Sequence, residues 1–170
     1  MTAAESSCII NWANFTAAGI GAILLGYFGR KTLFVYAQGA CIFGMFGMWI
    51  FSQLSPNDTM KLLFSVFFIF AFEFGPGPIA WLYLSEVCND QATSVNTVVN
   101  WGWTLVVSLG TLPLINAIDG WIYLGFGCTC ILGFAYLITM MKETKGLSKE
   151  ECKRLYLKSA NAGGYDQLVR

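Results

Sequence analysis

One carboxylate lies inside an otherwise apolar stretch of the sequence, residues 72–81, which reads FEFGPGPIAW. The acid is Glu73, and directly after it two glycines alternate with two prolines: Gly75, Pro76, Gly77 and Pro78. Because proline has no backbone N–H, Pro76 cannot donate to the Phe72 carbonyl, nor Pro78 to that of Phe74. Transporters commonly build their substrate sites around helices interrupted in this way at membrane depth. The four residues are therefore predicted to form a helix hinge beside a carboxylate that can bind a ligand.

A carboxylate accepts hydrogen bonds on both oxygens, and Trp81, about two helical turns after Glu73, offers a flat indole face. Sugars are bound by this combination, with hydroxyls on the carboxylate and the C–H face of the ring against the indole. The alternative is a structural kink in which Glu73 pairs with a neighbouring helix. No basic residue lies at matching depth in the sequence, so a salt bridge from within the chain is hard to supply.

A second set of polar side chains repeats every four residues after position 95. The set consists of Asn96, Asn100, Thr104 and Ser108. At this spacing the side chains form one stripe along a helix, and polar residues within lipid usually face a bundle interior or a water-filled cavity. The stripe alone fits either hydrogen bonds between helices or the wall of an aqueous pathway, and the interrupted helix favours the pathway.

Near the start of the chain the same spacing recurs among small residues. The set consists of Asn14, Ala18, Ala22 and Gly26. Small residues on one face let a neighbouring helix approach closely. This face is therefore predicted to pack against another helix, with Asn14 continuing it toward one end.

The elements that position these residues are predicted to be membrane helices. The chain has 170 residues, of which 56% are hydrophobic and 12% charged, whereas soluble domains carry about 25% charged residues. Five apolar stretches each approach the roughly 20 residues that cross a bilayer as a helix. They cover residues 8–28, 33–54, 62–84, 95–118 and 121–141. Strand-like alternation is absent, so the sequence predicts an all-α membrane protein.

The basic residues predict the orientation of these helices. Arg30 and Lys31 lie between the first two stretches, and seven more lysines and arginines lie in residues 142–170. Four crossings separate the two groups, so both fall on one side, which the positive-inside rule identifies as the cytoplasm. We therefore expect a multi-pass protein with its N-terminus outside, a cytoplasmic C-terminal tail at 142–170, and the plasma membrane as the favoured location.

The other features of the chain bound its chemistry. The sequence has no histidine, and its six cysteines include no CxxC pair, so no metal site and no cofactor are expected. The net charge of zero suggests no nucleic-acid partner. In the tail, Ser148 and Glu151 have the spacing of a capping box, which predicts a short helix that begins at Ser148. The lipid bilayer is the expected partner of the apolar stretches.

FEFGPGPIAW resembles the tenth-helix motif of the sugar porter branch of the major facilitator superfamily, which includes the facilitative glucose transporters. Four further segments follow in family order and resemble, in turn, motifs after helix eight, at the end of helix ten, in helix eleven and after helix twelve. They are Gly29-Arg30-Lys31, Ser85-Glu86, Asn100-Trp101 and Glu143-Thr144-Lys145-Gly146. The resemblance covers roughly residues 9–156 and implies part of the C-terminal half of that fold, helices eight to twelve.

The resemblance also implies residue roles. Glu73, Trp81 and Asn14 match positions that contact the sugar, Asn100 lies on the same wall, and Thr104 stands where the family often has a contacting asparagine. Arg30, Lys31, Glu86 and Glu143 match a cytoplasmic gate, in which Arg30 and Glu86 hold the two halves of the transporter together. The chain departs from the pattern at Gly26-Tyr27, where the resemblance implies an acidic and a basic residue, and at Lys142, where it implies proline.

Three functions remain open at this point. The first, which the sequence favours, is the C-terminal portion of a transporter of monosaccharides that works by alternating access and does not transport alone. The second is a short membrane protein that pairs with the missing N-terminal helices or regulates a full-length transporter. The third is a membrane enzyme. The sequence argues against it, because it shows no nucleophile–base pair, no set of metal ligands and no phosphate-binding loop.

Overall fold

The computed structural model describes residues 3–54 and 58–162, and in this part of the chain every regular element is a helix. The helices are α1 (Ala3–Tyr27), α2 (Arg30–Leu54), α3 (Asp58–Phe74), α4 (Pro76–Val87), α5 (Asp90–Ile118), α6 (Trp121–Met140) and α7 (Lys149–Ala162). Of the predicted tail, residues 163–170 lie outside the described residues.

Five spans of the described chain are long and apolar enough to cross a membrane, which confirms the predicted all-α membrane fold. Four of them are α1, α2, α5 and α6, and the fifth, Thr59–Val87, combines α3 and α4. Some helices begin earlier than the apolar stretches do, with α5 starting at Asp90 instead of residue 95. The reason is a polar cap, because the Asn89 side chain accepts a hydrogen bond from the Ala92 N–H over 2.8 Å.

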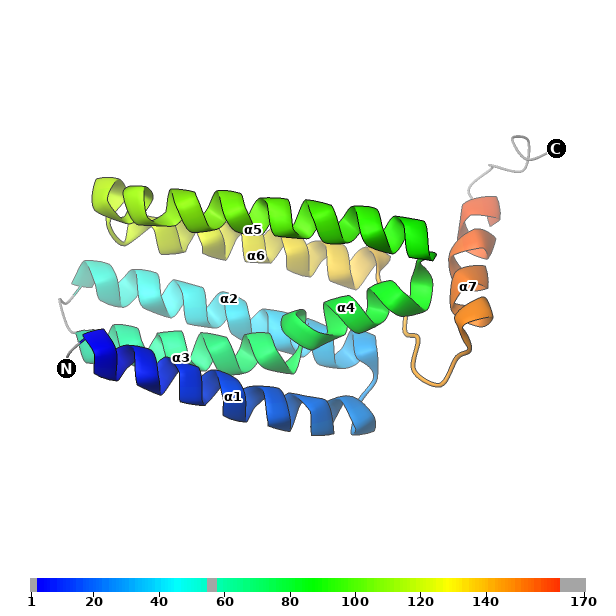
Figure 1. Cartoon of the computed structure of the whole chain (residues 1–170), viewed down its shortest axis with the longest axis horizontal. Helices are drawn as coiled ribbons and strands as arrows, with labels where there is room; N and C mark the ends of the chain where they lie inside the picture. Colours follow the sequence, from blue (N-terminus) through cyan, green and yellow to red (C-terminus); the bar gives the residue numbers. More distant parts are fainter. Residues whose placement is uncertain (1–2, 55–57, 163–170) are drawn as a thin grey trace.

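The long helices lie side by side, while α7 stands across one end of the bundle (Figure 1). α2 packs against both α3 and α6, and α1 packs against α3. The α1–α2, α4–α5 and α6–α7 connections all lie at the end where α7 stands (Figure 1). We call this the junction end of the bundle.

The helix break predicted at GPGP is present. α3 ends at Phe74, α4 begins at Pro76, and Gly75 lies between them. Pro76 occupies the first helical position of α4, where a missing N–H costs nothing. The lack of a Pro76 N–H predicts that the Phe72 carbonyl is left free, but this is wrong, because the Gly75 N–H donates to it over 3.3 Å. At the break, a tight turn therefore satisfies the Phe72 carbonyl with a hydrogen bond.

The predicted packing face of α1 is also wrong by one residue. Ala13, Ala17 and Gly21 are buried, whereas Ala18, Ala22 and Gly26 are exposed. Small residues line both faces of α1, so the sequence pattern could not choose between them. The contact with α3 selects the face, because a Cβ at Gly21 would lie 2.5 Å from the Glu73 carbonyl oxygen. Glycine is thus required where the two backbones approach most closely.

α5 is the least packed of the long helices. None of its residues is buried, and among the described residues it packs against α4 and α6 and reaches α7 through an exposed ion pair between Asp90 and Lys149. The buried core cluster is formed by Ile79, Leu137 and Met141, and it includes no residue of α5. Because a helix contributes stability through the face it buries, α5 leaves a long surface free to meet lipid, a ligand or other helices.

Candidate functional site

The residues singled out from the sequence meet in one pocket of about 690 Å³, a volume within the usual range for small-molecule sites. Its walls come from the α3–α4 break and from α5. The lining residues are Phe72, Glu73, Pro76, Gly77, Pro78, Ala80, Trp81, Leu84, Asn96, Asn100 and Thr104. The α3–α4 break and the polar stripe of α5 thus form facing walls. We refer to this cavity as the pocket.

Glu73 is held in place from outside the pocket. The Asn14 side-chain N–H donates to Glu73 Oε1 over 3.0 Å. The second oxygen, Oε2, has no hydrogen-bond partner among the described residues. One oxygen is therefore used to orient the carboxylate and the other is available to accept a hydrogen bond from a ligand.

The opposite wall offers polar groups at three successive turns of α5. The side-chain amides of Asn96 and Asn100 have no hydrogen-bond partner in the part of the chain that the structure describes. The Thr104 hydroxyl donates to the Asn100 carbonyl over 2.9 Å, so its oxygen remains an acceptor. An amide supplies two donors and an acceptor. This wall can therefore both give and receive hydrogen bonds, as a polyhydroxylated ligand requires.

Trp81 supplies the apolar surface of the pocket. Its side chain is 42% exposed and lies on α4, about one and a half turns beyond Pro76. A half-exposed indole beside a carboxylate and two free amides matches the chemistry of a sugar ring, which has hydroxyls at its edge and C–H groups on its faces. Among the predicted binding residues, Asn14 does not line the pocket, because its amide reaches Glu73 from α1.

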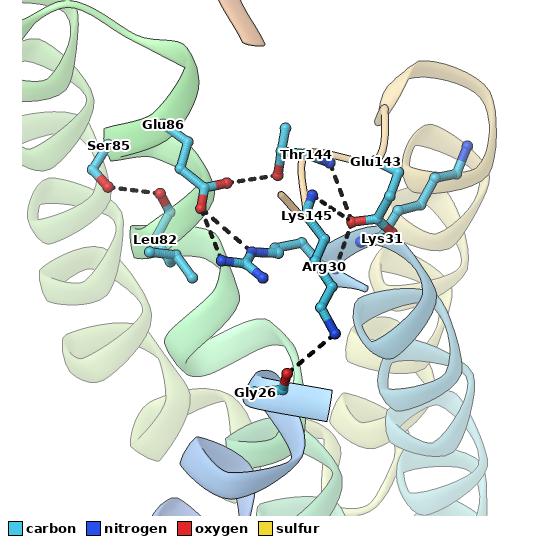
Figure 2. A network of polar contacts seen from close by, with 9 residues as sticks. All are labelled: Gly26, Arg30, Lys31, Leu82, Ser85, Glu86, Glu143, Thr144 and Lys145. Atoms are coloured by element: carbon cyan, nitrogen blue, oxygen red, sulfur yellow. Dashed lines mark hydrogen bonds and ion pairs between the residues drawn. The ribbon is translucent and has the colours of Figure 1, made fainter. Parts of the chain in front are cut away.

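A second polar cluster occupies the junction end, and we call it the junction. Arg30 donates from Nε and Nη2 to Glu86 Oε1, both over 3.3 Å. The Thr144 hydroxyl donates to the other oxygen, Oε2, over 2.6 Å. Figure 2 shows Glu86 between these two partners. Glu86 lies near the C-terminus of α4, where a helix dipole disfavours an anion, so these contacts offset an unfavourable position.

Glu143 caps the start of α2 from a distant part of the sequence. Its Oε1 accepts the Arg30 N–H over 2.7 Å, and its Oε2 accepts the Lys31 N–H over 3.1 Å. Oε1 also accepts the N–H groups of Thr144 and Lys145 at 3.1 Å (Figure 2). An anion at a helix N-terminus satisfies free donors and the dipole together.

Two lysines close the C-terminal ends of other helices at the junction. Lys145 Nζ donates to the carbonyls of Gly26 and Tyr27, over 3.1 and 2.6 Å, at the end of α1. Lys31 Nζ donates to the Ile138 carbonyl over 3.0 Å, near the end of α6. Cations at these positions neutralise free carbonyls and complement the dipole. At Gly26-Tyr27, where the resemblance predicts an acid and a base, the chain contributes two backbone carbonyls.

The tail helix is joined to α4 by two tyrosines. The hydroxyls of Tyr83 and Tyr156 are hydrogen-bonded to each other. Both accept the Lys142 N–H, over 3.1 and 3.2 Å respectively. Lys142 occupies the position where the resemblance predicts proline, which has no N–H. The substitution thus creates a donor, and the two hydroxyls satisfy it.

The predicted capping box at the start of α7 is confirmed. The Ser148 hydroxyl donates to Glu151 Oε2 over 2.7 Å, and the Ser148 N–H donates to the same oxygen over 2.8 Å. These hydrogen bonds lower the pKa of the Glu151 carboxyl. Cys152, one position on, is fully buried, and desolvation raises the pKa of its thiol.

Three residues of the pocket and the junction could not be assigned a role from the sequence. Asn96 appeared in the polar stripe but not among the predicted ligand contacts, although its spacing from Asn100 was a sufficient signal. Thr144 and Lys145 appeared within a motif, and nothing in their local sequence shows that they reach α4 and α1. Such partners depend on how the helices are placed.

Known proteins resemble this chain over most of its length. A family model described as "Sugar (and other) transporter" matches residues 1–156. A facilitated trehalose transporter from Aedes aegypti is 32% identical and aligns with 88% of this chain and 20% of its own length. The facilitated trehalose transporter from Polypedilum vanderplanki is 30% identical, with 88% and 32% covered. The chain thus spans about a fifth to a third of the length of these relatives.

Solved structures extend the likeness to the arrangement of helices. The inward open conformation of the xylose transporter XylE from E. coli gives a TM-score of 0.82 at 27% identity, covering 88% of this chain and 35% of that one. A partially occluded inward open conformation of the same transporter gives 0.71 at 26% identity, with 85% and 33% covered.

Proposed function

The chain belongs to the Sugar (and other) transporter family, and we propose that it supplies one wall of a sugar pathway in which Glu73 and Trp81 bind the sugar ring. It is an integral, multi-pass membrane protein, and its family is one of transporters, not of enzymes. The observation that carries the proposal is the pocket, where an oriented carboxylate, an indole face and two free amides meet at membrane depth.

Unpartnered polar groups within a bilayer are costly, so such groups usually line a water-filled cavity or bind a ligand. In the proposed complex a sugar hydroxyl donates to Glu73 Oε2, because Oε1 is already bound to Asn14. Asn100 donates to and accepts from neighbouring hydroxyls, and the Thr104 oxygen accepts another. The apolar face of the ring lies on Trp81. Each polar group uses a hydrogen-bond donor or acceptor that the protein leaves unpaired.

α5 forms one wall of the pocket but buries none of its residues. We therefore propose that further helices close the pocket in the complete transporter, and that these helices and this chain open alternately to either side of the membrane. The α3–α4 break at Gly75 provides the place where the pocket wall can bend. The junction then holds α1, α2 and α4 as one unit while that bend occurs.

The charge distribution supports an orientation in which the junction end and the tail lie in the cytoplasm. Basic residues gather there, at positions 30 and 31 and throughout the tail. The plasma membrane is the proposed location. For the substrate, a monosaccharide such as a hexose fits the groups around Glu73. The names of the relatives, transporters of trehalose and xylose, support a sugar.

A second candidate function rests on the exposed surface of α5. A membrane protein that pairs with a full-length transporter would also need a long unburied helix of this kind. Pairing alone leaves the orientation of Glu73 by Asn14 unexplained. Sugar binding accounts for both observations, so it is the function that we favour.

Saturation-transfer NMR on the purified chain in lipid nanodiscs tests the proposal. Methyl glucoside should receive saturation on its ring protons, and Trp81→Ala should weaken binding because the ring loses its apolar platform. Trp101→Ala is the matched control, since Trp101 is exposed on α5 and does not line the pocket. Equal binding in both variants, or no saturation with wild type, would contradict the proposal. In proteoliposomes, the chain alone should show no saturable uptake.

A further inference from the structure

A second cavity lies next to the pocket and is lined largely by other residues. Its volume is about 510 Å³, and its walls come mainly from α2, α4, α6 and α7. The two cavities share four residues, Pro76, Ala80, Leu84 and Asn96. Glu73 and Trp81, which are proposed to bind the sugar ring, line only the pocket. The second cavity is therefore a separate candidate site, and we call it the tail cavity because Tyr156 of the tail helix lines it.

Most of the tail cavity is apolar. The apolar side chains that face it come from α2, α4 and α6 and include Phe34, Val87, Leu137 and Met140. Water finds few hydrogen-bond partners between such side chains, whereas an apolar ligand gains dispersion contacts with all of them. The walls therefore favour a hydrocarbon chain over water or a sugar.

The end of the tail cavity at α7 is polar. Tyr83 and Tyr156 line it there, and their hydroxyls are hydrogen-bonded to each other. The Lys142 ammonium lies 5.1 Å from the centre of the Tyr156 ring and donates to the Leu155 carbonyl over 2.7 Å. An ammonium has three N–H donors, and this is the one hydrogen bond of Lys142 Nζ among the described residues. A cation with unused donors therefore lies beside the cavity.

The tail cavity runs from the junction end into the membrane. Gln38 and Gly133 line it, and they lie seven or eight residues inside the ends of α2 and α6 that meet the junction. At the rise of an α-helix this depth is roughly 10 Å. α7 stands across the same end of the bundle (Figure 1). A ligand in the cavity would thus have one end at the membrane surface and the other among hydrocarbon.

We propose that the tail cavity binds a single-chain anionic amphiphile, such as a fatty acid, with its carboxylate on Lys142 and its acyl chain between α4 and α6. A carboxylate forms strong, charge-assisted hydrogen bonds with an ammonium, and the apolar walls receive the chain. A neutral chain would fill the same space but leave the unused donors of Lys142 without an acceptor. This inference goes beyond the proposed function, because it requires no sugar.

Photo-crosslinking of the purified chain in lipid nanodiscs tests the proposal. The probes are dodecanoate with a diazirine in its chain and dodecanol with the same diazirine, at mildly alkaline pH so that the carboxylate is ionised. Mass spectrometry should locate the dodecanoate label in the parts of α4 and α6 that line the tail cavity, and unlabelled dodecanoate should compete. Half-maximal labelling should need roughly tenfold less dodecanoate than dodecanol. Label spread evenly over lipid-facing residues would overturn the site.

Lys142→Gln tests the anionic end of the ligand. The concentration of dodecanoate for half-maximal labelling should rise roughly tenfold, as expected for the loss of a charged hydrogen bond, while that of dodecanol should stay within about twofold. Lys149→Gln is the matched control, because Lys149 is exposed and pairs with Asp90 instead. It should change neither probe. Unchanged labelling by dodecanoate in Lys142→Gln, or equal weakening of both probes, would overturn the assignment of an anionic ligand.

Gly133→Leu tests the space for the chain. A Cβ at Gly133 would meet only the Gln38 amide nitrogen, at 3.4 Å, so the longer side chain enters the tail cavity and should reduce labelling by both probes at least tenfold. Gly125→Leu is the matched control on the same helix, since nothing lies within 4 Å of its added Cβ. Wild-type labelling in Gly133→Leu, or an equal loss in both leucine variants, would overturn the proposal. Neither readout depends on sugar binding, so the proposed function can fail or hold independently.

Discussion

The pocket and the junction each place glutamate carboxylates among polar groups but use those carboxylates in opposite ways. At the junction, both oxygens of Glu86 and of Glu143 accept hydrogen bonds from other helices or turns. In the pocket, Glu73 has one bound and one free oxygen, and the Asn100 amide has no partner among the described residues. Polarity alone therefore does not distinguish a binding site from a structural network, whereas unpaired hydrogen-bond donors and acceptors do.

The difference follows from where the partners come from. Glu143 meets the start of α2, where a helix presents unpaired N–H groups, and Glu86 meets the side chains of Arg30 and Thr144. In the pocket, Asn100 lies in the middle of α5, where the backbone is already paired, and Glu73 lies at the end of α3 beside the break. A polar side chain in the pocket thus stays free unless another side chain reaches it, as Asn14 reaches Glu73. Substitutions in each region test this distinction.

Glu143→Ala should destabilise the folded protein most. The carboxylate accepts two N–H groups at the start of α2 and two more in its own turn, and hydrogen bonds to charged groups contribute about 1.5–3 kcal/mol each without adding fully. The free energy of unfolding should fall by about 3 kcal/mol in denaturant titrations in detergent. Glu150→Ala, an exposed carboxylate of the tail, is the control. A loss no larger than that of the control would remove Glu143 from the network.

Gly21→Ala should connect the stability of the bundle to the shape of the pocket. The added Cβ would lie 2.5 Å from the Glu73 carbonyl oxygen, and overpacking of this kind costs about 2 kcal/mol. Because the contact is with the backbone of Glu73, sugar binding should weaken together with stability. Gly19→Ala is the matched control, since nothing lies within 4 Å of its added Cβ. Identical melting temperatures for the two variants would argue against the close approach.

Tyr156→Phe should loosen the tail helix without affecting the pocket. The change removes a hydroxyl that accepts the Lys142 N–H and is bonded to Tyr83, which should cost about 1 kcal/mol. Hydrogen exchange should then increase in residues 149–156 and stay unchanged in α5. Tyr136→Phe provides the control, because Tyr136 is exposed on α6. Faster exchange in α5 would show that the tail also supports the pocket.

The start of α7 should depend weakly on pH. The pKa of Glu151 is lowered in the folded protein by its bonds with Ser148, so the capping box stabilises α7 above the carboxyl's ordinary pKa of 4.5. That stabilisation is lost as the pH falls through the lower, folded pKa. Hydrogen exchange at the start of α7, corrected for its intrinsic pH dependence, should show decreasing protection below pH 4.5. Glu151→Gln should show no such step, and a step retained in that variant would exclude Glu151 as its source.

Much of this arrangement could be predicted from the sequence. Length and apolarity were sufficient for the five spans, and the missing N–H groups of Pro76 and Pro78 were sufficient for the break beside Glu73. The capping box could be predicted because Ser148 and Glu151 are only three residues apart. In each case the interaction that decides the structure is local in the chain.

Other features depended on interactions between distant segments and could not be predicted. The sequence alone does not decide whether Ala17 or Ala18 lies on the packing face of α1, because the position of the α3 backbone selects that face. The Glu143 contact with Arg30 joins residues 113 positions apart, so that no spacing rule applies. The two hydroxyls that satisfy the Lys142 N–H come from α4 and α7, and neither is adjacent to it in sequence.

The decisive measurement is the affinity of the purified chain for methyl glucoside, determined by NMR titration alongside thermal unfolding. Glu73→Gln should weaken binding roughly tenfold to a hundredfold, because the loss of a charged acceptor costs about 1.5–3 kcal/mol, and should leave the melting temperature nearly unchanged. Glu86→Gln should lower the melting temperature and leave the affinity within about twofold. Unchanged affinity in Glu73→Gln, or an equal loss of affinity in both variants, would contradict the assignment of the pocket as the sugar site.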